Sequence, residues 1–348
     1  NSNHTSWYET IADVVQLQPN KNMLDDLDDL RTQLEKYKDR KVKIGSFTAC
    51  SNVTGIETPY HKMAAIMHEY GGMAFVDFAA SAPYVDINMH PKNPIEKLDA
   101  IFFSPHKFLG GPGSSGVLIF DSGLYNSHSP DLPGGGTVDW TNPWGEYKFI
   151  DNIEAREDGG TPGFLQAIRT ALSIKLKEQI GTDRIEQREK ELVRIAFQEF
   201  RKIPGLNILA DKIEDRFGIF SFYLENVHFN LVVKLLNDRF GIQTRGGCAC
   251  AGTYGHYLLN VSYEDSHSIT NLINSGDLSK KPGWIRVSLH PTMTDEELLF
   301  IADAIKQIRE NAGEWAKDYI YNKHNNEFRH KDEPEDKTML IRDWFEFD

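Results

Sequence analysis

The sequence predicts an α/β fold, in which a large domain with a mostly parallel sheet precedes a smaller α+β domain. Two observations support this prediction. Short apolar strands alternate with helical segments from about residue 24 to residue 120, a pattern typical of a sheet with helices on both faces. The chain has 348 residues, 40% of them hydrophobic, which is enough for two cores.

The elements of the large domain follow one another at short intervals. Leucines at helical spacing predict a helix over Met23–Lys38. The next elements are a strand at Val42–Phe47, a helix at Pro59–Tyr70, an apolar strand that opens Ala74–Ser81, and strands at Ala100–Phe103 and Gly116–Phe120. Glycine and proline dominate Ser129–Gly145, which we expect to cross the surface toward a subunit interface. Thr161 and Pro162 predict the start of a helix of about twenty residues, since Thr caps helices and Pro suits the first turn.

The boundary between the two domains is predicted near Gly181, so the large domain takes residues 1–181 and the small one residues 182–320. An amphipathic helix with Leu192 and Phe197 on its apolar face opens the small domain. Its other elements are strands at Leu206–Leu209, Phe217–Leu224 and Trp284–Leu289 and helices at Phe229–Phe240 and Asp295–Glu310. Residues 321–348 are predicted to form a charged extension, in which Leu340–Phe345 is apolar enough to dock on the body.

Composition excludes several classes of function. A net charge of −13 without a cluster of Lys and Arg argues against binding to nucleic acid or to an anionic membrane. No apolar run approaches the roughly 20 residues that cross a bilayer. Three cysteines, two of them in a Cys-x-Cys, argue against a disulfide framework and for a reducing compartment, so we expect a cytoplasmic protein.

Lys107 lies between a buried strand and the glycine-rich turn 110–116. In α/β proteins, strand ends are where sites are built, and a desolvated lysine amine there can act as a nucleophile. Ser104 and His106 are able to donate hydrogen bonds to a phosphate. Together these residues indicate pyridoxal 5'-phosphate, an aldehyde that enzymes hold as a Schiff base on lysine. The alternative is an exposed lysine in a loop of Gly and Pro.

Asp77 ends an apolar strand thirty residues before Lys107. A carboxylate against the pyridine nitrogen of the cofactor keeps the ring protonated, so that the ring can take up carbanion electrons. Taken alone, an Asp after a strand is more often a helix cap or a turn residue. The pairing with Lys107 favours the cofactor site.

The motifs of this chain resemble those of the class V aminotransferase family, and within it the cysteine desulfurase and selenocysteine lyase branch. The resemblance extends from the first residues to about Gln307. Besides the Asp77 strand it rests on Ser51–Gly55, Ser104–Lys107, Gly134–Thr137, Arg156–Pro162, Arg245–Cys250 and Ile285–Leu289. It implies the fold of the fold-type I transferases that depend on pyridoxal phosphate.

The resemblance also assigns residues to the cofactor. It implies that Lys107 forms the Schiff base, Asp77 pairs with the ring nitrogen and Asn52 approaches the ring hydroxyl. His4 lies where the family places an imidazole stacked on the ring, although a histidine near a chain start is otherwise a surface residue.

The phosphate contacts implied by the resemblance come from two subunits. Ser104 and His106 are assigned to the phosphate of their own subunit, and Thr161 to that of the partner. The resemblance therefore implies a homodimer with shared sites.

Three further residues are assigned to the reaction. Arg286 is expected to bind the substrate carboxylate, because a planar guanidinium matches that group bidentately; a surface salt bridge is the alternative. Arg245 resembles an arginine near the nucleophile loop, and Cys250 aligns with the nucleophile itself. The implied reaction converts L-cysteine to L-alanine and an enzyme persulfide. Lys107 takes the Cα proton and His4 assists reprotonation, and a sulfur-acceptor protein is a further partner.

Other functions stay open. Cys248 and Cys250 are half of a zinc site if Cys50 and a histidine such as His256 complete it, although we expect no metal; they are otherwise packed thiols. Ala80 occupies the position of a glutamine that desulfurases commonly use to hydrogen-bond the ring hydroxyl. This departure keeps open an aminotransferase or another lyase of the same fold. A binding or scaffold protein without cofactor would leave the lysine and aspartate idle.

The start of the sequence also departs from the family. Members have a long segment before the stacking histidine, including a loop at a helix N-terminus that cradles the phosphate. This sequence begins at Asn1 without it. We therefore expect the sequence to be a piece of a longer protein.

Overall fold

The chain forms two compact units in a computed structural model that describes residues 2–20, 24, 26–249, 251–333, 342, 344 and 345. The N-terminal unit contains Ser6–Ser51 and Glu57–Gln187. The C-terminal unit contains Arg188–Asp348 together with Asn1–Thr5 and Asn52–Ile56. The domain limits expected from the sequence, at residues 181 and 320, stay predictions.

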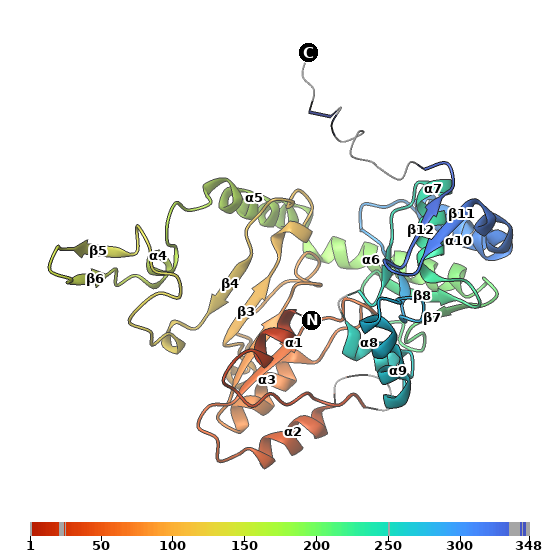
Figure 1. Ribbon diagram of the computed structural model, residues 1–348. Helices are drawn as coiled ribbons and strands as arrows, with labels where there is room; N and C mark the ends of the chain where they lie inside the picture. The colour runs from red at the N-terminus through yellow and green to blue at the C-terminus, as the bar shows by residue number, and fades with distance from the viewer. Residues whose placement is uncertain are drawn as a thin grey trace. The chain divides into compact units, whose positions relative to one another are not determined.

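The N-terminal unit is built on a four-stranded sheet (Figure 1). Its strands, in spatial order, are β1 (Ile44–Thr48), β2 (Met73–Asp77), β3 (Ala100–Phe103) and β4 (Val117–Phe120). The first three are parallel, and β4 runs antiparallel to β3. The predicted mostly parallel sheet is therefore confirmed. Because Asp77 pairs with Phe102 in the β2–β3 register, the carboxyl ends of these two strands meet at one edge.

Three longer helices belong to the N-terminal unit, namely α2 (Leu27–Lys36), α3 (Tyr60–Glu69) and α5 (Phe164–Ile180). Asp26 caps α2 by accepting hydrogen bonds from the first backbone N–H groups of the helix. Leu30 and Leu34 of α2 are buried, as the leucine spacing predicts. The shorter elements are α1 (Ser2–Tyr8), which spans the limit between the units, η1 (Pro94–Glu96), η2 (Pro105–Lys107), η3 (Ser122–Leu124) and α4 (Ile153–Glu157).

Two segments of this unit differ from the sequence-based prediction. Ser129–Gly145, for which the sequence predicts no helix or strand, contains β5 (Val138–Thr141), and β6 (Tyr147–Phe149), which follows the stretch, pairs with it as a hairpin. The helix expected to start at Thr161 and Pro162 begins at Phe164 instead, with Gly163 as its N-cap. The capping role predicted for Thr161 is therefore wrong.

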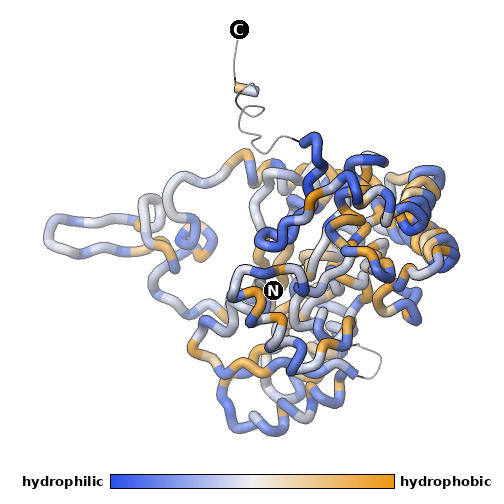
Figure 2. The backbone as a smooth tube through the Cα atoms, turned by 45° about the vertical axis from the view of Figure 1, so that its right-hand side comes forward, coloured by the Kyte–Doolittle hydropathy of each residue, from blue (hydrophilic) through white to orange (hydrophobic). Residues whose placement is uncertain are grey.

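The C-terminal unit has a second four-stranded sheet, which is antiparallel throughout. Its spatial order is β7 (Leu206–Ile208), β8 (Ile219–Leu224), β10 (Trp284–Ser288) and β9 (Arg245–Gly247). Its helices are α6 (Thr182–Phe200), which starts in the N-terminal unit, α7 (Phe229–Phe240), α8 (Gly252–Leu258), α9 (Tyr263–Asn274) and α10 (Asp295–Trp315). Hydrophobic and hydrophilic stretches alternate along the tube in Figure 2, as expected for helices with one buried face. The buried residues of α10, among them Leu298, Ile301 and Ile305, follow this spacing.

A hairpin stands where the sequence predicts the start of a charged extension. After the short η4 (Ala316–Asp318), β11 (Tyr319–Asn322) pairs antiparallel with β12 (Glu327–His330). Asn326 is buried in the turn and its carbonyl accepts a hydrogen bond from Asn230 of α7, so the hairpin is fixed to the unit. Half of the segment Leu340–Phe345, expected to dock, lies outside the described residues, and its docking stays a prediction. Within the part of the chain that the structure describes, no helix is long and apolar enough to cross a membrane.

Candidate active site

Lys107 is the last residue of η2, which is separated from the end of β3 by Ser104 alone. Ser104 is the N-cap residue of this short helix and Pro105 fills its first position, where the missing N–H of proline costs nothing. His106 and Lys107 are exposed, and Ser104 is half-buried. The Lys107 Nζ donates a hydrogen bond of 2.9 Å to the carbonyl oxygen of Ala79. That carbonyl belongs to the loop that follows the neighbouring strand.

Asp77 is the last residue of β2 and is half-buried. Its Oδ1 accepts a hydrogen bond of 2.8 Å from the Ala79 N–H. Burial raises the pKa of the Asp77 carboxyl, and the Ala79 N–H and the charge of Lys107 offset part of that rise. Asp77 and Lys107 therefore share one backbone partner, Ala79, at the carboxyl edge of two adjacent parallel strands.

The turn after Lys107 requires glycine. A Cβ on Gly111 would lie 1.9 Å from the carbonyl oxygen of Pro105, so any side chain there would push η2 out of place. Helix α5 holds the rest of the turn, because Arg169 donates to the Pro112 carbonyl at 2.6 Å and Thr170 donates to the Ser115 carbonyl at 3.3 Å. The glycine-rich sequence thus fixes the direction in which Lys107 leaves the sheet.

Ser81 is a residue that sequence reasoning missed. It follows Asp77 in the loop after β2, it is 1% exposed, and its hydroxyl has no hydrogen-bond partner among the described residues. A buried hydroxyl without a partner is rare in proteins. The sequence signal for Ser81 is its position shortly after the predicted strand that ends at Asp77, at the carboxyl edge of the sheet. Ala80, next to it, offers no side-chain hydrogen bond.

A second group of predicted residues meets in the C-terminal unit. The Asn52 Nδ2 donates to the carbonyl oxygen of Ala249 at 2.7 Å, and the Arg286 Nη1 donates to the carbonyl oxygen of Asn52 at 3.1 Å. Arg286 lies on β10 opposite Arg245 of β9. Asn52, both arginines and the loop that follows β9 are therefore neighbours, although the sequence assigned Asn52 to the cofactor ring.

The cysteine loop begins directly after β9. Cys248 is half-buried, its Sγ donates to the Pro282 carbonyl at 3.0 Å, and burial raises the pKa of its thiol. Ala249 is buried and adopts a left-handed backbone with φ +46°, which costs free energy for a residue other than glycine. Cys250 lies outside the described residues. In the described ranges, no group of three or more His, Cys, Asp or Glu side chains is arranged to hold a metal ion.

His4 and Thr161 are described without their predicted partners. His4 is half-buried on α1, and the unit to which it belongs is not the one that holds Lys107. Thr161 is exposed in the loop between α4 and α5. The roles that the sequence assigns to these two residues stay predictions.

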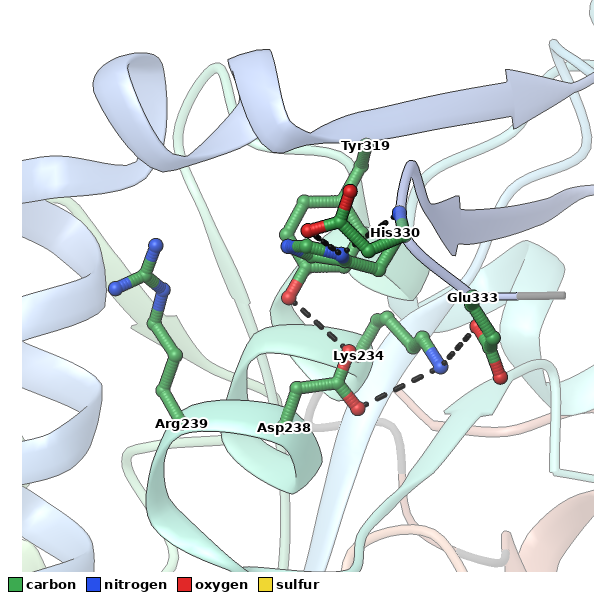
Figure 3. A pocket seen from close by; sticks show the side chains of 7 residues that line it. Lys234, Asp238, Arg239, Tyr319, His330 and Glu333 are labelled. Atoms are coloured by element: carbon green, nitrogen blue, oxygen red, sulfur yellow. Dashed lines mark hydrogen bonds and ion pairs between the residues drawn. The ribbon is translucent and has the colours of Figure 1, made fainter.

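A polar pocket of about 530 Å³ lies between α7 and the C-terminal hairpin (Figure 3). Lys234 faces Asp238 at 3.5 Å and Glu333 at 3.1 Å. The Tyr319 hydroxyl donates to Asp238 at 3.1 Å, and burial together with this carboxylate raises the pKa of Tyr319 to about 12. These contacts join the hairpin and the residues after it to α7. Because the charges are paired within the protein, we assign no ligand to the pocket.

Comparison with known proteins gives the family. The family described as aminotransferase class-V matches residues 1–300. "Probable cysteine desulfurase 2" of Mycobacterium leprae is 29% identical over 253 residues, which cover 72% of this chain and 59% of that protein. A "Probable cysteine desulfurase" of Staphylococcus aureus strain Mu50 is 32% identical over 244 residues, which cover 68% and 57%. The chain thus spans less than two thirds of the length of either relative.

Solved structures give the fold. A cysteine desulfurase from Thermococcus onnurineus NA1 superposes with a TM-score of 0.70 at 24% identity, covering 85% of this chain and 66% of that one. The cysteine desulfurase CsdA from Escherichia coli also has a TM-score of 0.70, at 23% identity, with coverage of 88% and 68%. These likenesses confirm the predicted α/β fold of the fold-type I enzymes. With a family match over residues 1–300, the chain belongs to the class V aminotransferase family, whose members depend on pyridoxal phosphate.

Proposed function

We propose that the protein is a pyridoxal phosphate enzyme of the cysteine desulfurase or selenocysteine lyase type, which acts on L-cysteine or a close relative. The observation that carries this proposal is the meeting of Lys107 and Asp77 at the backbone of Ala79. An amine and a carboxylate at the carboxyl edge of a parallel sheet stand where α/β enzymes bind their ligands.

The side chains at this edge fit the cofactor by their chemistry. The Lys107 amine suits an aldehyde, and the Asp77 carboxylate suits a protonated pyridine nitrogen. The Ser104 hydroxyl and the His106 imidazole are donors that suit a phosphate. When bound, pyridoxal phosphate would supply a sink for the electrons released at the substrate Cα.

The residues of the chain then carry the remaining work. Lys107 takes the proton from the substrate Cα, and His4 assists its return. Asp77 supplies the negative charge that keeps a proton on the cofactor ring. Arg286, one of whose Nη groups is held by the Asn52 carbonyl, binds the substrate carboxylate.

Cys250 is the proposed nucleophile of the sulfur step. Its thiolate attacks the substrate sulfur, so that an S–S bond forms, the Cβ–S bond of the substrate breaks, and the Cβ takes up a proton to give L-alanine. Cys248 is a poor candidate, because burial raises the pKa of its thiol and the thiol donates a hydrogen bond to the Pro282 carbonyl. Arg245 is exposed on β9, close along the chain to both cysteines, and favours a thiolate.

An assay of the full-length protein with pyridoxal phosphate and L-cysteine tests this function. We expect sulfide in the presence of a thiol reductant, an equal amount of alanine, and one added sulfur on Cys250 by mass spectrometry. Cys250→Ala should lose nearly all sulfide release, since the proposal gives neither Cys50 nor Cys248 a role in the sulfur step. Cys248→Ala is the matched control and should keep most of it. Equal activity in both variants would contradict the role of Cys250.

The second candidate function is that of an aminotransferase or of another lyase without a catalytic cysteine. Ala80 favours it, because alanine cannot hydrogen-bond the cofactor ring, and such bonds tune the reaction. The same assay decides between them. Formation of pyruvate or another keto acid from an amino acid, with no persulfide on the enzyme, would support this alternative. Alanine without sulfide is not an expected product of it.

A homodimer is part of the proposal, with Thr161 reaching the partner's phosphate site. Helix α5 carries four large apolar side chains that are more than half exposed, Phe164, Leu165, Ile168 and Leu172. An apolar face of this kind is typical of an interface, and two-fold dimers are the commonest oligomers. Sedimentation of the full-length protein should give a dimer; a fully active monomer would contradict this. We keep the cytoplasm as the compartment and a sulfur-acceptor protein as a partner, both as proposals.

A further inference from the structure

Lys177 lies on α5, the helix that borders both loops of the cofactor edge. Its Nζ donates a hydrogen bond of 2.9 Å to the carbonyl oxygen of Ala82 and a second one to that of Val85. Both carbonyls belong to the loop that follows β2 and contains Ala79. One ammonium group therefore holds that loop at two points.

The same ammonium also reaches the segment of Lys107. The Lys177 Nζ lies 5.8 Å from the centroid of the Phe108 ring, within range of a cation–π contact. Phe108 is 5% exposed, follows Lys107 directly and packs on Phe103 at the end of β3. Lys177 thus contacts the loop of Asp77 on one side and the turn of Lys107 on the other.

Keeping the Lys177 ammonium group charged in a half-buried position costs free energy. Lys177 is half-buried, and burial lowers the pKa of its ammonium, while Asp86 and Glu178 partly restore it. The Thr182 hydroxyl donates a hydrogen bond of 2.9 Å to the Asp86 carboxylate, which connects the same loop to the start of α6. Two carbonyl oxygens accept hydrogen bonds from the end of this long, flexible side chain.

The Lys177 contacts do not depend on Lys107. A lysine nitrogen that binds an aldehyde carbon keeps at most one of its three protons, so the hydrogen bond from Lys107 to Ala79 would weaken with the cofactor bound. The two hydrogen bonds from Lys177 do not involve the Lys107 nitrogen. Besides the pairing of β2 with β3, Lys177 is then the side chain placed to keep the spacing between the two loops.

We propose that Lys177 is a positioning residue that fixes the loop of Asp77 against the turn of Lys107, so that the cofactor binds in one orientation. This inference rests on the proposed function, since it assumes that pyridoxal phosphate binds at this edge. It assigns to Lys177 no contact with the cofactor.

The test compares three variants of the full-length protein, titrated with pyridoxal phosphate. Lys177→Met removes the ammonium and keeps the stem, and Lys177→Arg keeps a donor with a positive charge. Lys175→Met, on the exposed side of the same helix, is the control. The readouts are the dissociation constant from the visible absorption band, the visible circular dichroism per bound cofactor, which reports its orientation, and the melting temperature.

We expect Lys177→Met to raise the dissociation constant by about tenfold and to lose at least about half of the visible circular dichroism, since charge-assisted hydrogen bonds are lost. Lys177→Arg should restore much of both, and Lys175→Met should match the wild type. A Lys177→Met protein with a lower melting temperature but an unchanged dissociation constant and circular dichroism would overturn the inference. If Lys177→Met does not fold, Lys177→Gln, which keeps one donor, decides by the same readouts. A wild type that shows no visible band would instead refute the proposed function.

Discussion

The two ends of the β2–β3 strand pair carry one carboxylate each, and the two carboxylates are treated in opposite ways. At the amino end, Asp99 is 4% exposed and fully engaged: it accepts from the Ala74 N–H at 2.8 Å, from His68 at 2.7 Å and from Lys97 at 3.0 Å. At the carboxyl end, Asp77 accepts from the Ala79 N–H.

The pKa shifts of these two carboxyls follow from this difference. Burial acts to raise the pKa of Asp99, but the Ala74 N–H, His68 and Lys97 outweigh it, and the pKa is lowered. For Asp77 burial wins and the pKa is raised. One end of the strand pair is built for stability, and the other end carries a charge that the fold alone does not favour. An unfavourable charge in a folded protein is a common property of functional sites.

Loss of the reactive amine gives the largest effect that the comparison predicts. Lys107→Ala should abolish the visible absorption of the protein with pyridoxal phosphate, because no imine can form without the amine. Its melting temperature should stay close to that of the wild type, since an exposed side chain contributes little to stability. Lys92→Ala, another exposed lysine of the same unit, serves as the control and should keep the band. A Lys107→Ala protein with an unchanged absorption band would contradict the assignment of Lys107 as the residue that binds the cofactor aldehyde.

Exchange of each carboxylate for its amide should separate function from stability. Asp77→Asn should lower turnover by about 10- to 100-fold, because a hydrogen bond to a charged group contributes about 1.5–3 kcal/mol. The free energy of unfolding should change by less than about 1 kcal/mol, since the fold disfavours the charge that is removed. Asp99→Asn should do the reverse: the free energy of unfolding should fall by roughly 1–3 kcal/mol and turnover in the folded protein should stay near that of the wild type.

Denaturant unfolding and the L-cysteine assay on both variants measure this contrast. Equal losses of stability in the two variants would show that the two ends do not differ. A drop in turnover for Asp99→Asn under conditions where it is folded would place part of the site at the amino end.

The meeting of Lys107 and Asp77 at one edge of the sheet is the part of the candidate site that the sequence predicts best. Lys107 and Asp77 each follow an apolar strand, and neighbouring parallel strands bring their carboxyl ends together. This is possible because the contacts join the ends of two strands that follow one another along the chain and pair in the sheet. The hydrogen bond between Lys107 and Ala79 needs no more than the pairing of adjacent strands.

Other features depend on contacts that no local pattern contains. The bond from Asn52 to Ala249 joins positions 197 residues apart, and Lys177 carries no signal that separates it from the other lysines of an amphipathic helix. Strand β9 was missed because Arg245–Gly247 has low β-propensity, and its pairing with β10 alone makes it a strand. The hairpin of β11 and β12 was missed because its charged sequence suggests a solvated tail, whereas Asn326 supplies the left-handed turn that it needs.

Acid titration gives the smallest and most specific effect. Asp99 has a lowered pKa in the folded state, so it stabilises the protein above its unfolded pKa of about 3.9 and loses that contribution as the pH falls through the folded value. Asp77 has a raised pKa, so its charge destabilises the protein at neutral pH, and protonation removes that penalty on acidification. The two carboxyls should therefore change stability with opposite signs.

Melting temperatures of the wild type and the two amide variants between about pH 7 and pH 3 test these signs, over the range in which carboxyls titrate. The wild type should be more stable than Asp99→Asn at pH 7, and the gap should narrow below about pH 4 as Asp99 takes up its proton. The melting temperature of Asp77→Asn should equal or slightly exceed that of the wild type at pH 7. This difference, opposite in sign to that of Asp99→Asn, should also vanish in acid. Gaps of the same sign in both variants would mean that Asp77 is a structural carboxylate like Asp99, and the argument that its charge is kept for a ligand would fail.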